Sequence, residues 1–316
     1  MTTFNLYPKF EDFNVSTRTY IILTNMTIDL KHIFQTLPIS DYHIIPKKSG
    51  RKKKTAILDP NKDIKPGSII TIENGECIRG VDLKKKKNKK REGKHDRENE
   101  SKHKHFFRNS VTIVMVLTDK IINFKISSNG KIQMTGCKYI YQAVETVKFL
   151  WKHLSSDKLS HKITDDFQAI FIPVMRNIDF NAKFIIDREK IHNYINTETD
   201  YISIISTNLG YTGVNIKFPV KHIQPDLKLL KLTLKEDWIA SHITWSDYLK
   251  ILSEKDRKKA LKQRENSFLV FHSGMIIMSG MVSETMKGDY DKFIEILSNN
   301  RNYFEENLDT SIISDT

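Results

Sequence analysis

Short segments in which apolar and polar residues alternate lie beside segments in which apolar residues recur at steps of three and four. The first pattern is typical of a half-buried strand, and the second of an amphipathic helix. We therefore expect strands at residues 15–23, 111–117, 121–127 and 131–135, and helices at residues 29–37 and 139–154. A β-like stretch at residues 68–79 contains the turn Glu73-Asn74-Gly75-Glu76. This mixture predicts an α+β fold.

The order of these elements occurs twice along the chain. In both copies two glycines lie six residues apart, Gly130 and Gly136 in the first and Gly274 and Gly280 in the second. The first glycine of each pair suits a turn, and the second suits the end of a strand before a helix. Repeats of this kind indicate one architecture built twice.

The flanking helices carry the same repeat. Upstream, Ile28-Asp29 and Ile33 match Ile186-Asp187 and Ile191. Downstream, the helix-face spacing of the first copy matches that of the second, pairing Ile140, Val144, Val147 and Trp151 with Met286, Tyr290, Phe293 and Leu297. We expect two pseudo-symmetric repeats that form a curved antiparallel sheet (a saddle), with helices on the convex face. The other face is then open, and exposed apolar faces usually mark binding sites.

The positive charge is concentrated in one segment. Residues 47–104 hold 20 Lys and Arg against 9 Asp and Glu, which is +11 of the net +13 of the chain. Such a tract favours nucleic acid through neutralisation of phosphates, and a solvated disordered loop or a nuclear-localisation tract is the alternative. Residues 84–105 have almost no apolar side chain, so we expect disorder there.

These features divide the chain into segments. We expect the first part of repeat 1 at residues 1–46, a basic, partly disordered insert at 47–108, and the remainder of repeat 1 at 109–160. Repeat 2 follows at 161–300 with an insert at about 220–263, and a tail ends the chain at 301–316. In the insert, Thr244-Trp245-Ser246-Asp247 resembles a capping box that opens a helix through about Lys262.

Three segments of the second half carry a resemblance to a known family. They are Arg176-Asn177-Ile178-Asp179-Phe180, the strand from Tyr211 to Phe218, and the strand from Phe268 to Gly274. Together they resemble the C-terminal repeat of TATA-box-binding proteins, and the chain is most similar to divergent members from large DNA viruses. A basic Gly-Arg-Lys-Lys-Lys insert, present here at residues 50–54, fits the viral members. The resemblance covers about 200 residues in patches.

The resemblance implies a saddle that lies in the minor groove of A·T-rich double-stranded DNA and bends it. It assigns roles to three sets of residues. The wedges that enter base steps are Tyr211, Phe271 and Ile126. The groove floor is met by Asn177, Thr19, Thr135, Ser279, Gln133 and Ile277. Phosphates are contacted by Lys131, Lys138, Lys217, Arg51, Lys52, Lys53 and Lys54. For each residue an ordinary role in the core or at the surface is the competing interpretation.

Asp179 departs from the family pattern, because a carboxylate two residues after Asn177 would face DNA and be repelled by phosphates. Either the register there is shifted by one residue or the face has changed. The expected function is a transcription-initiation factor whose partners are DNA, a protein similar to transcription factor IIB, and RNA polymerase. The alternative is a protein-interaction scaffold with the same fold that has lost DNA bending and holds nucleic acid only through its basic insert.

Other classes of protein are disfavoured by what the sequence lacks. It shows no phosphate-binding loop, zinc spacing or nucleophile elbow, so we expect no enzyme, no metal and no cofactor. Cys77 and Cys137 make no disulfide framework, and no apolar run is long enough to span a membrane. We expect an intracellular protein of the nucleus or of a viral replication compartment, or one packaged in the virion.

Overall fold

The computed structural model describes residues 7–44, 60–83, 109–205, 213–220 and 223–306. Helices and antiparallel strand pairs alternate along the described chain, and the sheet is open rather than closed into a barrel. The predicted α+β class is therefore confirmed. No helix in the described ranges is long and apolar enough to cross a membrane.

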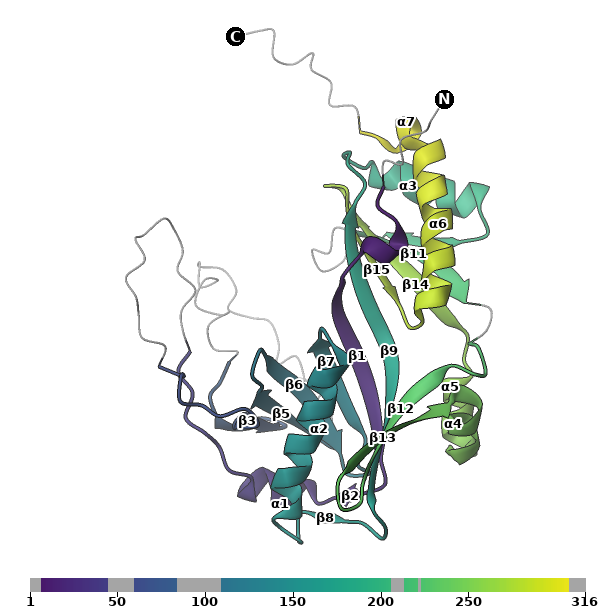
Figure 1. The fold of residues 1–316 in the computed structure, drawn as a ribbon. Coiled ribbons are helices and arrows are strands. Elements are labelled where there is room, and N and C mark those ends of the chain that lie inside the picture. Colours follow the sequence, from purple (N-terminus) through teal and green to yellow (C-terminus); the bar gives the residue numbers. More distant parts are fainter. Residues whose placement is uncertain (1–6, 45–59, 84–108, 206–212, 221–222, 307–316) are drawn as a thin grey trace, which may run out of the picture. The chain divides into compact units, whose positions relative to one another are not determined.

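The chain forms two compact units (Figure 1). We name each after its longest helix. The α6 unit comprises Met1–Thr19, Pro173–Leu229 and His242–Thr316, and the α2 unit comprises Tyr20–Ile172 and Leu230–Ser241. Two long strands, β1 (Val15–Thr24) and β9 (Phe167–Asn181), contribute residues to both units. Each unit buries a hydrophobic core of its own.

The α2 unit packs its helices on one face of a sheet with the strand order β1-β7-β6-β5-β3-β4. Its strands are β3 (Ile69–Asn74), β4 (Cys77–Gly80), β5 (Ser110–Val116), β6 (Ile121–Ser127) and β7 (Ile132–Cys137), and its helices are α1 (Leu30–Thr36) and α2 (Ile140–Ser155). A small separate sheet pairs β2 (Thr27–Ile28) with β8 (His161–Lys162). Strand β12 (Lys228–Leu234) pairs with β9 from Leu230 to Leu234 and leads into β13 (Trp238–Thr244).

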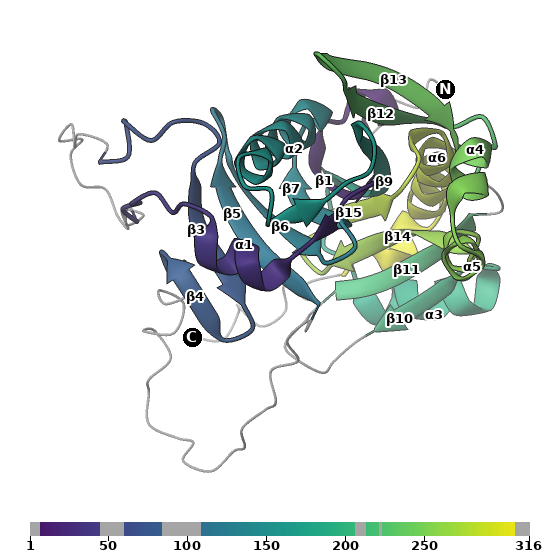
Figure 2. The ribbon, with the colours of Figure 1, turned by 90° about the horizontal axis from the view of Figure 1, so that it is seen from below.

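The α6 unit follows the same plan with the strand order β9-β15-β14-β11-β10. Its strands are β10 (Ile202–Ile205), β11 (Gly213–Val220), β14 (Arg264–Phe271) and β15 (Met275–Gly280). Its helices are α3 (Arg188–Glu198), α4 (Trp245–Ile251), α5 (Glu254–Ala260), α6 (Ser283–Asn299), α7 (Arg301–Phe304) and the 3-10 helix η1 (Phe10–Asp12). Figure 2 shows α4 and α5 side by side, as Figure 1 also does.

The first five strands in the order of the α2 unit correspond to the five strands of the α6 unit. The residues that begin the helices also correspond. The Asp29 carboxylate accepts a hydrogen bond from the His32 amide at 2.9 Å, and Asp187 caps α3 in the same way through the Glu189 and Lys190 amides. Ile33 and Ile191 are both fully buried. In both units the repeated Ile-Asp…Ile pattern therefore encodes the same structure, in which the aspartate is a helix N-cap and the second isoleucine is a core residue.

The predicted equivalence of the two long helices is wrong by three residues. The buried face of α6 contains Met286, Tyr290, Phe293 and Leu297, as expected. The matching buried positions of α2 are Ala143, Val147, Leu150 and Leu154, whereas Ile140 is 39% exposed. The Gln142 side chain can be buried because its polar atoms are paired. It accepts hydrogen bonds from the Lys138 and Tyr139 amides and donates one to Asp119. The buried face of α2 includes the polar residues Gln142 and Thr146, so the apolar pattern of the sequence did not show which face is buried.

The predicted helix through about Lys262 is also interrupted. Thr244 caps α4 as expected, its hydroxyl accepting from the Asp247 amide at 3.1 Å. The chain then leaves the helix at Leu252, whose backbone is extended, and Ser253 caps a second helix, α5. A serine with an aspartate three residues later starts a new helix for the same reason that Thr244 does. The hairpin of β12 and β13 was not predicted.

Candidate nucleic-acid interface

Helices α3, α6 and α7 pack on one face of the α6-unit sheet, and the described side chains of the other face are exposed or half-buried. Residues of the covered side form a cross-strand row, Ile216, Phe268, Met278 and Ile178, all buried in the core. Because side chains alternate along a strand, the residues between them point to the opposite side. We call that side the open face. It contains Asn177, Asp179, Ile202, Ile204, Gly213, Asn215, Lys217, Glu265, Ser267, Leu269, Phe271, Met275, Ile277 and Ser279.

Strand register orders the open face into rows. One row runs Ile202, Lys217, Ser267, Ser279 and Asn177 across five strands. The next row runs Ile204, Asn215, Leu269, Ile277 and Asp179. The structure therefore brings together four residues that the sequence predicted for one interface, namely Asn177, Ile277, Ser279 and Lys217. Their roles toward DNA remain predictions.

Phe271 lies at the end of a third row, half-buried and opposite Gly213. A Cβ built on Gly213 would lie 2.7 Å from Leu269 Cδ1 and 3.5 Å from Phe271 Cε1. The glycine thus leaves room for both side chains on the open face. Tyr211, the other predicted wedge, lies outside the described residues, as do Arg51, Lys52, Lys53 and Lys54.

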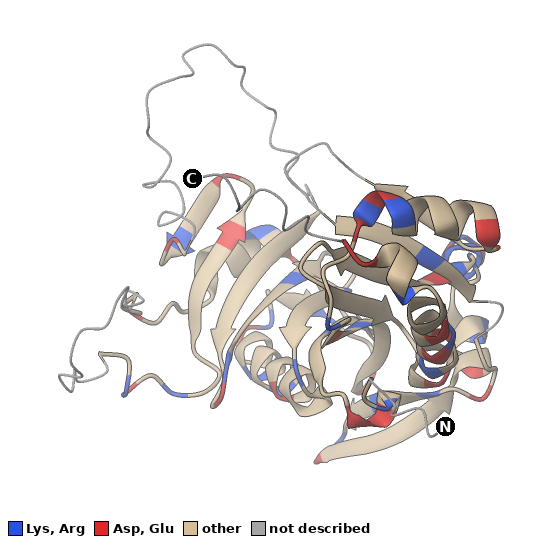
Figure 3. Cartoon of the chain, turned by 90° about the horizontal axis from the view of Figure 1, so that it is seen from above, with Lys and Arg blue, Asp and Glu red and all other residues tan. Residues whose placement is uncertain are grey.

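The open face has little positive charge of its own. Lys217 Nζ is paired with a carboxylate oxygen of Glu265 at 2.8 Å. Asp179 is exposed in the same row as Ile277, so the register is not shifted and the carboxylate does share this face. Figure 3 shows most strand ribbon free of charged residues, with both signs present on the helices.

Asn177 contributes the amide group of the face. Its backbone carbonyl accepts from the Ser16 hydroxyl at 3.2 Å, and its side-chain Oδ1 is buried without a hydrogen-bond partner in the described structure. Buried polar atoms normally have a partner. The unpaired Oδ1 needs a donor, whereas the Nδ2 of the same amide is the atom that can donate to an acceptor on a base edge.

The corresponding face of the α2 unit is polar. Thr112, Lys125 and Gln133 form one row, and Val114, Asn123 and Thr135 form the next. Gln133 and Thr135 are exposed, as a groove-floor role requires. Lys131 is exposed at the preceding turn, and Lys138 Nζ lies 5.4 Å from the centre of the Tyr139 ring.

Two predicted site residues are placed wrongly for contact with DNA. Ile126 is fully buried in the helix-covered core of the α2 unit, paired with Val111 and Ile132. It cannot act as a wedge, because its side chain points away from the open side of the sheet. Thr19 is 7% exposed, so its hydroxyl is not available as part of a groove floor.

Sequence reasoning missed other residues of the open face. Leu269, Met275 and Ile204 lie there, and Met275 and Ile204 are 42% and 46% exposed. The signal for Leu269 was the alternation from Arg264 to Phe271, in which Asn266, Phe268 and Val270 are the buried set. That alternation fixes which residues share a side, but it does not show which side the helices cover.

No family model matches the chain, whereas a viral protein and solved structures are similar to it. Uncharacterized protein 335L of Invertebrate iridescent virus 6 is 26% identical over 225 residues, which are 66% of this chain and 66% of that protein. The match thus spans slightly less than two thirds of the viral protein. Among solved structures, Methanococcus jannaschii TBP has a TM-score of 0.39 and 10% identity, covering 92% of this chain and 99% of that one.

Proposed function

We propose that this protein binds double-stranded DNA without catalysing a reaction, and that the open face of the α6 unit enters the minor groove of A·T-rich promoter DNA. The observation that carries the proposal is the row of Ser267, Ser279 and Asn177 beside the apolar Leu269, Ile277 and Phe271. The resemblance of the sequence to TATA-box-binding proteins supports the same function. Recruitment of a protein similar to transcription factor IIB and of RNA polymerase is part of the proposal.

The chemistry of the minor groove suits such a face. Its floor presents mainly acceptors at A·T pairs, and the phosphates lie along its edges rather than on the floor. Small hydroxyl side chains and an amide can approach the floor closely, and apolar side chains can enter base steps. An inserted wedge costs a few kcal/mol in lost stacking, which wider contact offsets. Flexible TA steps are the least costly to deform.

Fluorescence anisotropy with A·T-rich and G·C-rich duplexes across a salt series tests this proposal. The A·T-rich duplex carries a donor and an acceptor dye at its ends, so that energy transfer reports bending. We expect preference for the A·T-rich duplex, with bending that persists at moderate salt. Equal binding of both duplexes without bending, lost steeply with salt, would mean that only phosphates are contacted.

The wedge assignment has its own variants. Tyr211→Ala combined with Phe271→Ala should abolish bending while leaving part of the affinity, because phosphate contacts remain. Tyr303→Ala is the matched control, since Tyr303 is a 50%-exposed aromatic of α7 outside the open face. Unchanged energy transfer in the double variant would contradict the wedge role.

A second function is favoured by Asp179 and by the pairing of Lys217 with Glu265. With these charges the open face holds two acids and one base, which disfavours close approach of phosphates. The alternative is a protein-interaction scaffold that holds nucleic acid only through the basic segment at residues 47–104. Deleting residues 84–105 separates the two functions. Retained A·T preference supports the DNA-binding face, and loss of all DNA binding supports the scaffold.

A further inference from the structure

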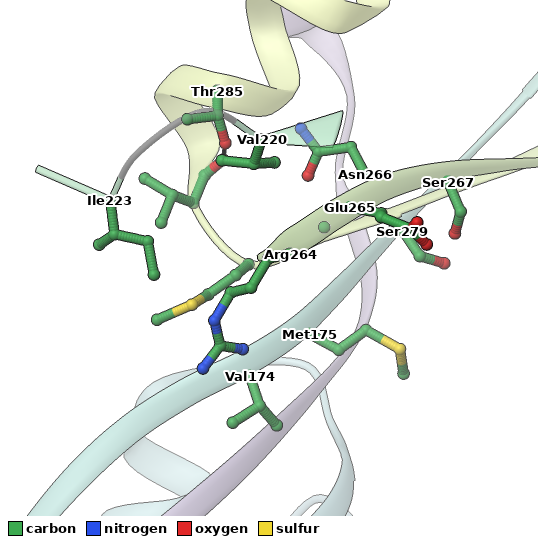
Figure 4. A pocket seen from close by; sticks show the side chains of 13 residues that line it. Val174, Met175, Val220, Ile223, Arg264, Glu265, Asn266, Ser267, Ser279 and Thr285 are labelled. Carbon is green, nitrogen blue, oxygen red and sulfur yellow. Dashed lines mark hydrogen bonds between the residues drawn. The ribbon is translucent and has the colours of Figure 1, made fainter. Parts of the chain in front are cut away.

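A pocket opens at one end of the α6-unit sheet, where β9, β11, β14 and β15 meet the start of α6 (Figure 4). Its volume is about 180 Å³, which is the size of a side chain with a short piece of backbone rather than of a nucleotide. Apolar contacts come from Val174, Val220, Met281 and Val282. The polar groups come chiefly from β14, whose strand begins at Arg264.

Two of these polar groups have no hydrogen-bond partner. Arg264 Nε and Asn266 Oδ1 are buried and unpaired in the described structure. The two residues lie two positions apart on β14, and therefore on the same side of the strand. The Asn266 amide nitrogen is already used, because it donates to Asp289 at 2.7 Å. The lining residues of the pocket thus include one unmet donor and one unmet acceptor.

The charge on Arg264 is also poorly compensated. Its guanidinium carbon lies 5.9 Å from the centre of the Trp245 ring, and no ion pair joins it to an acid in the described ranges. Burial lowers the pKa of Arg264 from its ordinary value, yet a guanidinium stays protonated in proteins. A positive charge held in a partly apolar pocket without an acid is a favourable site for an incoming carboxylate.

We propose that this pocket binds a short acidic peptide segment of a protein partner. A carboxylate of the segment accepts from Arg264 Nε, and a backbone N–H next to it donates to Asn266 Oδ1. An apolar neighbour contacts Val174, Met281 and Val282. A phosphate of DNA fits less well, because it supplies acceptors and leaves Asn266 Oδ1 unmatched.

The test uses the full chain and a short fluorescein-labelled peptide of alternating Asp and Leu, compared with the same peptide carrying Asn in place of Asp. We expect the Asp peptide alone to bind. Arg264→Gln should weaken it about tenfold or more, because a hydrogen bond to a charged group is lost. Lys255→Gln removes the same charge from the exposed face of α5 and should change affinity by less than about twofold.

Arg264→Lys keeps the positive charge and provides a second variant in case Arg264→Gln fails to fold. Circular dichroism checks that both variants are folded. Arg264→Lys should still weaken the peptide, because an ammonium group lacks the fixed Nε–H. Equal binding of the Asp and Asn peptides, or equal weakening by Arg264→Gln and Lys255→Gln, would overturn the proposal. So would competition by inorganic phosphate as strong as that by the peptide. A loss of duplex affinity in Arg264→Gln but not in Lys255→Gln would assign the pocket to DNA instead.

Discussion

Two turn glycines provide the sharpest test of the repeated architecture. Gly130 and Gly274 have φ angles of 71° and 79°, in the region that side chains rarely adopt. A Cβ on Gly130 would lie 2.2 Å from the carbonyl oxygen of Met26, and one on Gly274 would lie 2.4 Å from that of Phe184. Alanine therefore meets two penalties at each site, a strained backbone and a collision with another backbone segment.

The size of the effect follows from these penalties. A left-handed alanine costs about 1–2 kcal/mol, and forcing an extra carbon into an occupied space costs about 1–3 kcal/mol. Gly130→Ala and Gly274→Ala should each lower the free energy of unfolding by about 2–5 kcal/mol. A Gly136→Ala variant separates backbone strain from the collision, because φ at Gly136 is 82° but nothing lies within 4 Å of a Cβ built there. Gly136→Ala should cost only about 1–2 kcal/mol.

Urea unfolding combined with hydrogen exchange measures these changes unit by unit. Each unit has its own core, so we expect Gly130→Ala to weaken exchange protection first in the α2 unit and Gly274→Ala first in the α6 unit. Gly288→Ala is the control, since this exposed position in α6 has open space and gains helix propensity of about 1 kcal/mol. If Gly136→Ala were as costly as Gly130→Ala, the collision with Met26 would not be what requires glycine.

Three further expectations concern individual side chains. Burial raises the pKa of Asp289, although the hydrogen bond from Asn266 opposes that shift. The native state therefore binds the proton more tightly than the unfolded chain does, and stability falls as pH rises above the ordinary pKa of about 3.9. Asp289→Asn should therefore stabilise the protein in urea unfolding at pH 7 and bring no gain in acid, and a gain of equal size in acid would contradict this sign. Asp179→Asn should raise affinity for A·T-rich duplex in anisotropy titrations by about threefold at low salt, since a repulsive charge is removed, and unchanged affinity would mean that the open face does not approach DNA. Thr244→Ala should cost about 1 kcal/mol through loss of the α4 cap in thermal unfolding. Ser246→Ala, at the second residue of the same helix, removes a hydroxyl that in the described structure hydrogen-bonds only the Thr244 hydroxyl and should cost clearly less.

The sequence determined the local features of both repeats. Asp29 and Asp187 begin helices because a short carboxylate satisfies free amides at a helix N-terminus. Gly130 and Gly274 mark the tight turns because only glycine adopts their backbone angles without strain. The strand at residues 121–127 was predicted with its observed bounds, since apolar and polar residues alternate from Ile122 to Ser127.

The tertiary structure decided which face each side chain occupies. The buried stripe of α2 includes Gln142 and Thr146, whose polar groups are satisfied by neighbours that lie elsewhere in the chain or one turn away. Alternation placed Ile126 and Asn177 on defined sides of their strands, but only the packing of α2 and α6 made one side a core and left the other open. The unpaired Arg264 and Asn266 could not be recognised from sequence, because a missing partner is a property of the space around an atom rather than of the residues that flank it.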